Sequence, residues 1–226
     1  MERPGDRRRG MTWGRTQETK RAILDAAAGA FTGHGFANTS VTEIGERAGA
    51  TIGSLYHHFG GKAEIFVALW DDFIEQKHQR VRDAVSQARQ DGEGNSFALF
   101  MVGARTYLEL AWETRDLVLL FYAGDTPPGF SAVVRRTSTE WVGRNFRHLR
   151  IEDDAVNRVI NSMLSSLVHT SGKDVAACAE EADARKLIEE RIRLLERLRA
   201  IYYPDGHQPE ASLAPAPLSP PRQAVS

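Results

Sequence analysis

The feature that most restricts the fold of this chain is a pair of short amphipathic segments joined by one glycine, within residues 40–59. The first opens with Ser40-Val41-Thr42-Glu43, where a serine hydroxyl and a glutamate carboxylate can satisfy free amides of a first helical turn. Gly49 ends this segment, and the second begins at once with Thr51 as its N-cap. Two short helices joined by a tight glycine-containing turn are typical of a helix-turn-helix, whose second helix enters the major groove of DNA.

Helical periodicity continues through most of the chain. Apolar residues recur at intervals of three and four, and alternating runs typical of strands are few. The pattern predicts an all-α protein whose helices cover about 16–31, 40–48, 51–59, 61–85, 96–114, 116–124, 129–149, 152–170 and 178–203. Residues 1–16 are rich in arginine and lack an amphipathic pattern, which predicts a flexible basic arm. Six of the nine prolines lie in 204–226, which predicts a disordered tail.

The distribution of charge separates the first part of the chain from the rest. The net charge is −1, yet residues 1–62 hold nine basic and six acidic residues, whereas 63–203 hold 19 basic and 22 acidic ones. A basic first quarter on an acidic remainder is expected when one end meets nucleic acid. Cys178 is the single cysteine, and no secretory signal or transmembrane stretch is evident, so we expect a reducing, cytoplasmic location.

Residues 39–66, TSVTEIGERAGATIGSLYHHFGGKAEIF, together with AILDAAAGAFTGHGF at 22–36, resemble the DNA-binding domain of tetracycline-repressor-like (TetR) regulators. The LYHHF end of the second short helix and the lysine that follows occur in register with the helix-turn-helix. The resemblance implies a three-helix DNA-binding domain over 17–62. It also implies a helical effector-binding and dimerisation domain over 63–203, where no sequence motif stands out.

By this resemblance, Thr42, Tyr56, His57 and Lys62 contact DNA phosphates. The residues expected to face base edges are Thr51, Ile52, Gly53 and Ser54, which form the first turn of the second short helix. Lys62 has a physical argument too, because a cation at a helix N-terminus is unfavourable unless an anion sits there. Tyr56 could instead be half-buried packing, Gly53 a tolerated first-turn glycine and Lys62 a solvated surface residue.

The second short helix does not reveal its operator. Ile52 departs from the basic residue that many relatives carry at this position and cannot hydrogen-bond a guanine edge, although it can contact a thymine methyl group. The arginines of the arm could enter a minor groove or lie near phosphates. His57 and His58 are adjacent on a helix and point about 100 degrees apart, so we predict no metal site, and no cofactor is expected.

Large apolar residues in the remainder could line an effector cavity, although aromatic residues at helical spacing are more often core packing. The candidates for effector binding are Trp70, Phe100, Trp112, Phe121, Trp141 and Met163. The last two helices carry wide apolar stripes that a homodimeric four-helix bundle would bury. Their members are Val156, Val159, Ile160, Met163, Leu164, Leu167 and Val168, and Leu187, Ile188, Ile192, Leu195 and Leu198.

These observations favour a ligand-responsive transcriptional regulator, in particular a repressor. It would bind a palindromic operator as a homodimer and be released by a small apolar or aromatic effector. An activator, or a helical interaction protein of this fold without an effector, are the alternatives. An enzyme is not expected, since the chain lacks nucleophile-elbow, phosphate-loop and zinc-protease motifs. The sequence identifies neither the effector nor the regulated genes.

Overall fold

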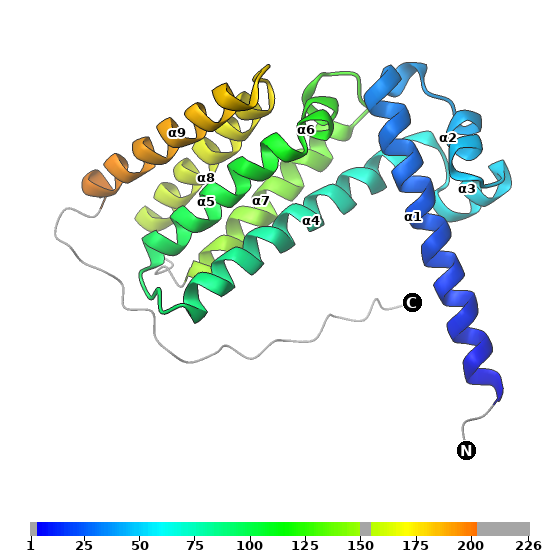
Figure 1. The fold of residues 1–226 in the computed structure, drawn as a ribbon, viewed down its shortest axis with the longest axis horizontal. Coiled ribbons are helices and arrows are strands. Elements are labelled where there is room, and N and C mark those ends of the chain that lie inside the picture. Colours follow the sequence, from blue (N-terminus) through cyan, green and yellow to red (C-terminus); the bar gives the residue numbers. More distant parts are fainter. Residues whose placement is uncertain (1–3, 150–154, 203–226) are drawn as a thin grey trace.

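The fold is helical, as the periodicity predicts. A computed structural model describes residues 4–149 and 155–202, and within these ranges every regular element is a helix (Figure 1). The predicted tail, 204–226, lies outside the described residues. The helices are α1 (Pro4–Asn38), α2 (Val41–Ala48), α3 (Ile52–Phe59), α4 (Lys62–Gln90), α5 (Ser96–Glu113), α6 (Arg115–Tyr122), α7 (Phe130–Leu149), α8 (Ala155–Ala176) and α9 (Glu181–Tyr202).

The first helix is longer than predicted at both ends. It begins at Pro4, so the expectation of a flexible arm over 1–16 is wrong for residues 4–16. A proline fits the first turn of a helix, because the amide that it lacks would have no partner there. The predicted stop at Gly33-His34-Gly35 is a kink, with Gly35 at φ 81°, after which the helix continues to Asn38. The side chains of the arginines before Thr16 lie outside the described residues.

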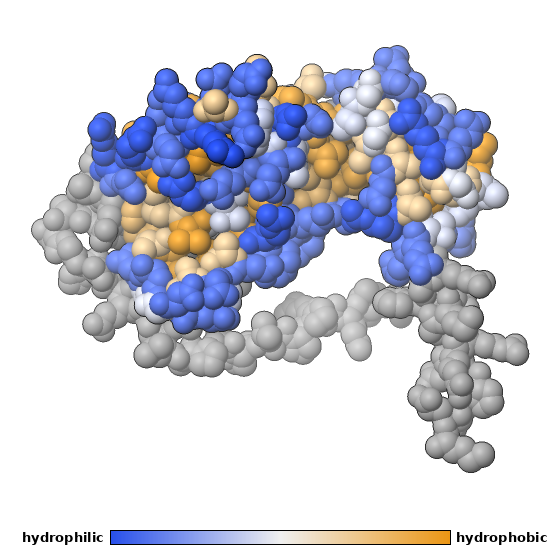
Figure 2. All heavy atoms as spheres, viewed as in Figure 1, coloured by the Kyte–Doolittle hydropathy of each residue, from blue (hydrophilic) through white to orange (hydrophobic). Residues whose placement is uncertain are grey.

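The helices form a small head and a larger bundle. In Figure 1, α1, α2 and α3 lie together at one end of the molecule, and α4 runs from this head along the bundle formed by the later helices. Figure 2 shows hydrophilic side chains over α9 and apolar ones gathered over the helices between α9 and α4 on the face in view. Within the described part of the chain, no helix is both long enough and apolar enough to cross a membrane.

One core joins the head to the bundle. We call it the aromatic core, because rings dominate its centre. Phe66 on α4 lies with its ring centroid 5.2 Å from Phe31 of the head, 5.3 Å from Phe121 on α6 and 5.0 Å from Phe130 on α7. Trp70, one turn further along α4, lies 5.1 Å from Phe121. Edge-to-face arrangements at these distances add to the stability gained from burial.

A second core, here the aliphatic core, fills the space between α5, α8 and α9. Its buried members are Leu99, Phe100, Ala104, Leu108, Ile160, Leu164, Val168, Val175, Ala184, Ile188, Ile192 and Leu195.

This packing corrects the predicted dimer faces. Six residues assigned to the two stripes are buried inside the chain itself, namely Ile160, Leu164, Val168, Ile188, Ile192 and Leu195. The stripes were wide because α8 and α9 pack on each other and on α5. Val159 and Met163, 58% and 53% exposed, remain on the outer side of α8, and Leu194 is also exposed on α9. The side chain of Val156 lies outside the described residues.

Candidate nucleic-acid interface and effector cavity

Local hydrogen bonds fix the two short helices. The hydroxyl of Ser40 accepts a hydrogen bond from the Glu43 amide at 3.1 Å, and that of Thr51 accepts one from the Ser54 amide at 3.1 Å. Gly49 ends α2 in the left-handed region at φ 62°. These caps confirm the predicted starts and the turn. Buried Ile44 on α2 and Leu55 on α3 then anchor the pair against the rest of the head.

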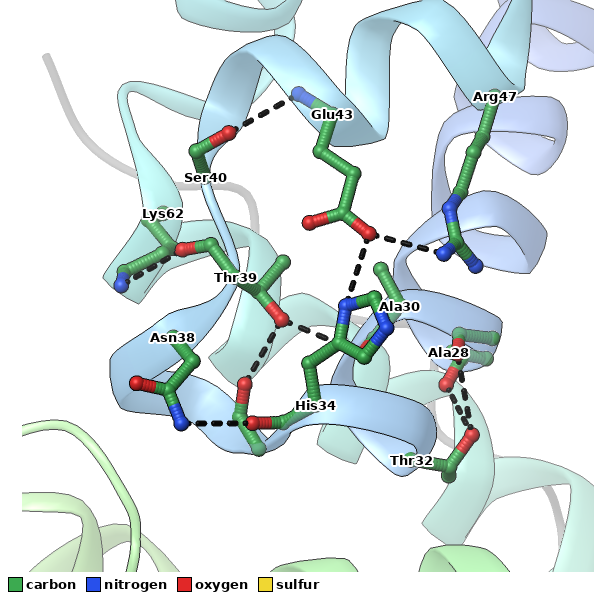
Figure 3. Close-up of polar contacts among 12 residues, drawn as sticks. Ala28, Ala30, Thr32, His34, Asn38, Thr39, Ser40, Glu43, Arg47 and Lys62 are labelled. Atoms are coloured by element: carbon green, nitrogen blue, oxygen red, sulfur yellow. Dashed lines mark hydrogen bonds and ion pairs between the residues drawn. The ribbon is translucent and has the colours of Figure 1, made fainter.

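The carboxylate of Glu43 does not complete the predicted capping box. It lies 3.0 Å from Nδ1 of His34 at the end of α1 and 2.9 Å from the guanidinium of Arg47, one turn along α2 (Figure 3). The capping box is therefore half confirmed, since the serine caps the helix while the glutamate joins α2 to α1.

The structure places the predicted DNA-contacting side chains on an accessible surface. Thr42, Thr51, Gly53 and His57 are exposed, and Ser54 is half-buried. Ile52 and Tyr56 are 46% and 54% exposed, although both are large and partly apolar. This exposure excludes half-buried packing as the role of Tyr56. Contact with phosphates or bases stays a prediction for this group.

Lys62 has a role that the sequence did not indicate. Its ammonium donates hydrogen bonds to the carbonyl oxygens of Phe36 at 2.7 Å, Ala37 at 3.2 Å and Thr39 at 2.9 Å. It also lies 4.4 Å from the centroid of the Phe36 ring. An ammonium has three donors, and all three are used. A phosphate contact would have to replace one of these bonds, so the structure shows Lys62 as a clamp between the end of α1 and the start of α4. Figure 3 shows its bond to the Thr39 carbonyl.

A second contact ties the head to the bundle. The backbone amide of Ala37 donates to both carboxylate oxygens of Asp125, in the loop after α6, at 3.2 Å each. Gly35 allows this approach, because a Cβ at that position would collide with the same carboxylate. The kink in α1 and the loop between α6 and α7 therefore meet at one point.

The bundle holds a cavity of about 240 Å³ between α4, α5, α7 and α8. A larger depression of about 550 Å³ on α5 and α9 is lined mainly by charged side chains, including the ion pair of Arg105 and Glu189. The described lining of the smaller cavity is instead mainly uncharged. Its lining residues are Trp70, Ile74, His78, Tyr107, Thr137, Ser138, Ser165, Ser166, His169 and Thr170.

Of the six predicted effector residues, only Trp70 is among those lining this cavity. Phe100 and Phe121 are buried in the two cores, and Met163 is exposed on α8. Trp112 stacks on the guanidinium of Arg115, with 4.5 Å between the guanidinium carbon and the ring centroid. The side chain of Trp141 lies outside the described residues. Hydrophobicity alone does not distinguish aromatic residues that fill a core from those that line a cavity.

Polar groups at the cavity are absent from the residues predicted to bind an effector. His169 on α8 hydrogen-bonds through Nδ1 with the hydroxyl of Tyr107 at 3.1 Å and through Nε2 with that of Tyr122 at 3.2 Å. Burial, with a smaller effect of the Lys173 and Lys77 charges, lowers the pKa of His169 to about 4. At neutral pH the imidazole is therefore uncharged, and both of its nitrogens are engaged.

Lys77 lies beside this group on α4. It is 4% exposed, and its ammonium lies 4.0 Å from the ring centroid of Tyr107 and 5.2 Å from that of Phe73. Burial lowers the pKa of Lys77 to about 7. A signal for this site was present in the sequence, because Lys77 and His78 continue the apolar stripe of Leu69, Trp70, Phe73 and Ile74 along α4.

Taken together, an accessible helix-turn-helix on a basic head defines a DNA-binding protein of the helix-turn-helix class. The profile of the tetR family of bacterial regulatory proteins matches residues 23–69. The helix-turn-helix domain of this chain belongs to this family, and the curated proteins that match it include HTH-type transcriptional regulators.

Two curated relatives illustrate the extent of the likeness. The HTH-type transcriptional regulator TtgR of Pseudomonas putida is 40% identical over 78 residues, which cover 34% of this chain and 37% of that protein. The A-factor receptor protein of Streptomyces griseus is 36% identical over 172 residues, which cover 75% of this chain and 58% of that protein. Each match thus spans less than two thirds of the relative's length.

The fold of most of the chain resembles that of a solved structure. A TetR-family transcriptional regulator from Streptomyces coelicolor superposes with a TM-score of 0.58 at 22% identity, covering 81% of this chain and 96% of that chain. This likeness extends the shared fold beyond the head and into the bundle.

Proposed function

We propose that this protein is a ligand-responsive transcriptional repressor, which binds a palindromic operator as a homodimer and releases it when an effector fills the cavity beside Trp70. The observation that carries the proposal is that α4 begins at the head and also lines the cavity. Lys62 at its start holds the end of α1, and Trp70, two turns later, faces the cavity.

The aromatic core supplies the mechanical connection. Trp70 packs edge-to-face on Phe121, and Phe121 packs edge-to-face on Phe66, which contacts Phe31 in the head. Packed interiors respond to displacement by shifting as units rather than by deforming smoothly. A ligand that moves Trp70 would therefore move α4 and, through it, the head. The ligand acts only if it binds the released state more tightly than the DNA-bound state.

The dimer would form through the outer side of α8 and α9. Exposed Val159, Met163 and Leu194 lie on these helices, and a two-fold axis there would bury them against their copies. Dimeric helix-turn-helix proteins place the two helices that enter the major groove about 34 to 36 Å apart, which is the length of one turn of DNA. In this chain that helix would be α3. This spacing is the quantity that an effector would change. Because a two-fold axis would relate the two copies, the operator would be palindromic.

The test is selection of DNA by the full chain from a random library, followed by binding measurements on the enriched sequence. We expect an inverted repeat, bound by two copies of the chain. Tyr56→Phe removes one hydroxyl from the exposed face of α3 and should weaken binding, whereas Leu119→Ala, exposed on α6, should not. Enrichment of no sequence would refute the proposal. A promoter reporter carrying the selected site separates a repressor from an activator.

A further inference from the structure

The hydroxyl of Ser165 is a buried polar group that the packing of the bundle does not explain. Ser165 lies on α8, one turn before His169, and both residues line the cavity. It is 2% exposed, and its oxygen has no hydrogen-bond partner among the described residues. A buried polar atom without a partner costs free energy, so such an atom usually meets water or a ligand.

Two other hydroxyl groups of the cavity wall are paired, in contrast to that of Ser165. Thr137 and Ser138, on α7, donate to the carbonyl oxygens of Val133 at 3.1 Å and Val134 at 2.9 Å, each four residues earlier. This is a common arrangement for a hydroxyl inside a helix. Ser165 is also inside a helix and makes no such bond, so its proton is available. Because a serine hydroxyl rotates to suit its partner, it can donate to an acceptor in the cavity.

The described lining of the cavity carries no permanent charge, since aspartate, glutamate, lysine and arginine are all absent from it. Burial is the main cause that lowers the pKa of the lining residue His169 to about 4, so this imidazole is neutral at pH 7. Lys77 lines a different pocket, between α1, α4, α5 and α6, together with three carboxylates. An ion in the cavity would therefore lack a counter-charge on the described walls. Burying an unpaired ion costs far more than burying a neutral polar group.

The volume and the walls of the cavity restrict the ligand further. A cavity of about 240 Å³ is larger than the roughly 150 Å³ cavity that binds benzene in another protein, so it has room for one ring with a small substituent. Trp70 and Ile74 supply apolar surface from α4. Ser166 and Thr170, which also line the cavity, are exposed on α8, so a ligand can enter beside them. A ring with one polar atom would suit both kinds of wall.

From these observations we propose that the cavity binds a compact, uncharged aromatic compound with a carbonyl group, whose oxygen accepts a hydrogen bond from the hydroxyl of Ser165. The ring would lie against Trp70 and Ile74. A carbonyl oxygen suits the site because it accepts a hydrogen bond without carrying a charge. This inference rests on the proposed function, because it names the chemical class of the effector for the same cavity.

Three probes of nearly equal shape test the charge preference: acetophenone, benzoate and benzamidine, which are neutral, anionic and cationic. Each would be titrated into the full chain at pH 8, where a histidine of ordinary pKa is neutral. Ligand-observed NMR would give the affinities, with thermal shift as a second readout. We expect acetophenone to bind at least about tenfold more tightly than either ion. An ion that binds as tightly as acetophenone, or no binding of acetophenone at millimolar concentrations, would overturn the proposal.

A fourth probe and one variant test the hydrogen bond. The compound α-methylstyrene has the shape of acetophenone, with a CH₂ group in place of the oxygen. Ser165→Ala should weaken acetophenone binding by about fivefold and leave the affinity for α-methylstyrene unchanged. Ser162→Ala, exposed on the same helix, is the matched control and should change neither affinity. An equal loss of both affinities in Ser165→Ala, or no loss of acetophenone binding, would contradict the hydrogen bond.

The unliganded variant gives an independent check. Because the hydroxyl of Ser165 has no partner to lose among the described residues, Ser165→Ala should unfold at the same temperature as the wild-type chain or at a higher one. A clearly lower unfolding temperature would show that the hydroxyl is already paired in the folded chain, and this would overturn its assignment as a free donor.

The outcome can be separated from that of the proposed function. DNA binding of the unliganded chain is measured without any probe. A chain that selects an operator but does not bind acetophenone keeps the regulatory role and contradicts the ligand class proposed for the cavity. A chain that binds the probes in the predicted order but selects no DNA keeps the ligand site and loses the proposed regulatory role.

Discussion

The two cores of this protein differ in how much apolar surface remains exposed beside them. The aromatic core buries Phe31 and Phe66 fully, and its rings form a continuous series of contacts from the head to α7. The members of the aliphatic core are buried as well, but Val159 and Met163 remain exposed on the outer side of α8 beside it. The cavity lies where the two regions meet, with Trp70 from one and Ser165 from the other on its walls. The aromatic core is therefore suited to transmit movement between the cavity and the head. The exposed outer side of α8 is suited to contact a partner.

The most damaging single change should be Phe66→Ala. Its ring is fully buried and contacts rings from the head, α6 and α7, so removal should cost about 4 kcal/mol of unfolding free energy. Urea unfolding followed by circular dichroism and by tryptophan fluorescence would measure this loss. Because one core joins head and bundle, both signals should change in a single transition. Separate transitions in the wild-type chain would show that the head and bundle are not coupled in this way.

Acid should weaken the boundary between the two regions. His169 has a pKa near 4 in the folded protein, against an ordinary value of 6.5, because burial and the Lys173 and Lys77 charges oppose protonation. The folded state thus binds fewer protons than the unfolded state between these values. Stability should fall by about 3 kcal/mol as pH drops from 6.5 to 4. His169→Gln, which does not titrate, should lack this component in unfolding curves recorded across that range.

At the head, Lys62→Met should cost about 2 kcal/mol, because it removes three hydrogen bonds to the carbonyls of Phe36, Ala37 and Thr39. Measurements of operator affinity at several salt concentrations distinguish this clamp from a phosphate contact. A clamp leaves the dependence of log affinity on log salt unchanged, whereas a lost phosphate contact reduces the slope by about one. Arg89→Met, far along α4, serves as a control for a general loss of charge.

The smallest effect on the folded chain is expected from Val159→Ser and Met163→Ser together. Both side chains are more than half exposed, so the stability of the isolated chain should change by less than about 0.5 kcal/mol for each substitution. Dimer formation should nevertheless weaken, as measured by sedimentation at several protein concentrations. An unchanged dimer would place the interface elsewhere on the molecule.

The helix-turn-helix could be predicted closely because its signals are local. A cap such as Ser40 or Thr51 and a left-handed glycine such as Gly49 act on neighbours within a few residues. The same holds for the all-α fold, since periodicity reports which face of each helix is buried.

The cavity and the dimer face could not be predicted in this way. Whether Phe121 lines a cavity or fills a core depends on which helix packs against it, and this information is not local. The faces of α8 were assigned to a partner because the sequence does not distinguish burial by α5 from burial by a second chain. The role of Lys62 could not be predicted for the same reason, because its hydrogen-bond acceptors lie 23 to 26 residues earlier in the chain.

The clamp formed by Lys62 also affects the conformational entropy of the chain. By joining the start of α4 to the carbonyl of Phe36, it closes a loop of 26 residues that contains α2 and α3. Closing a loop limits the relative motion of everything within it, and the entropy of closure is lost once, when the protein folds. The helix expected to enter the major groove, α3, therefore lies within a closed loop. An effector would move this loop as one rigid body without changing the surface that faces DNA.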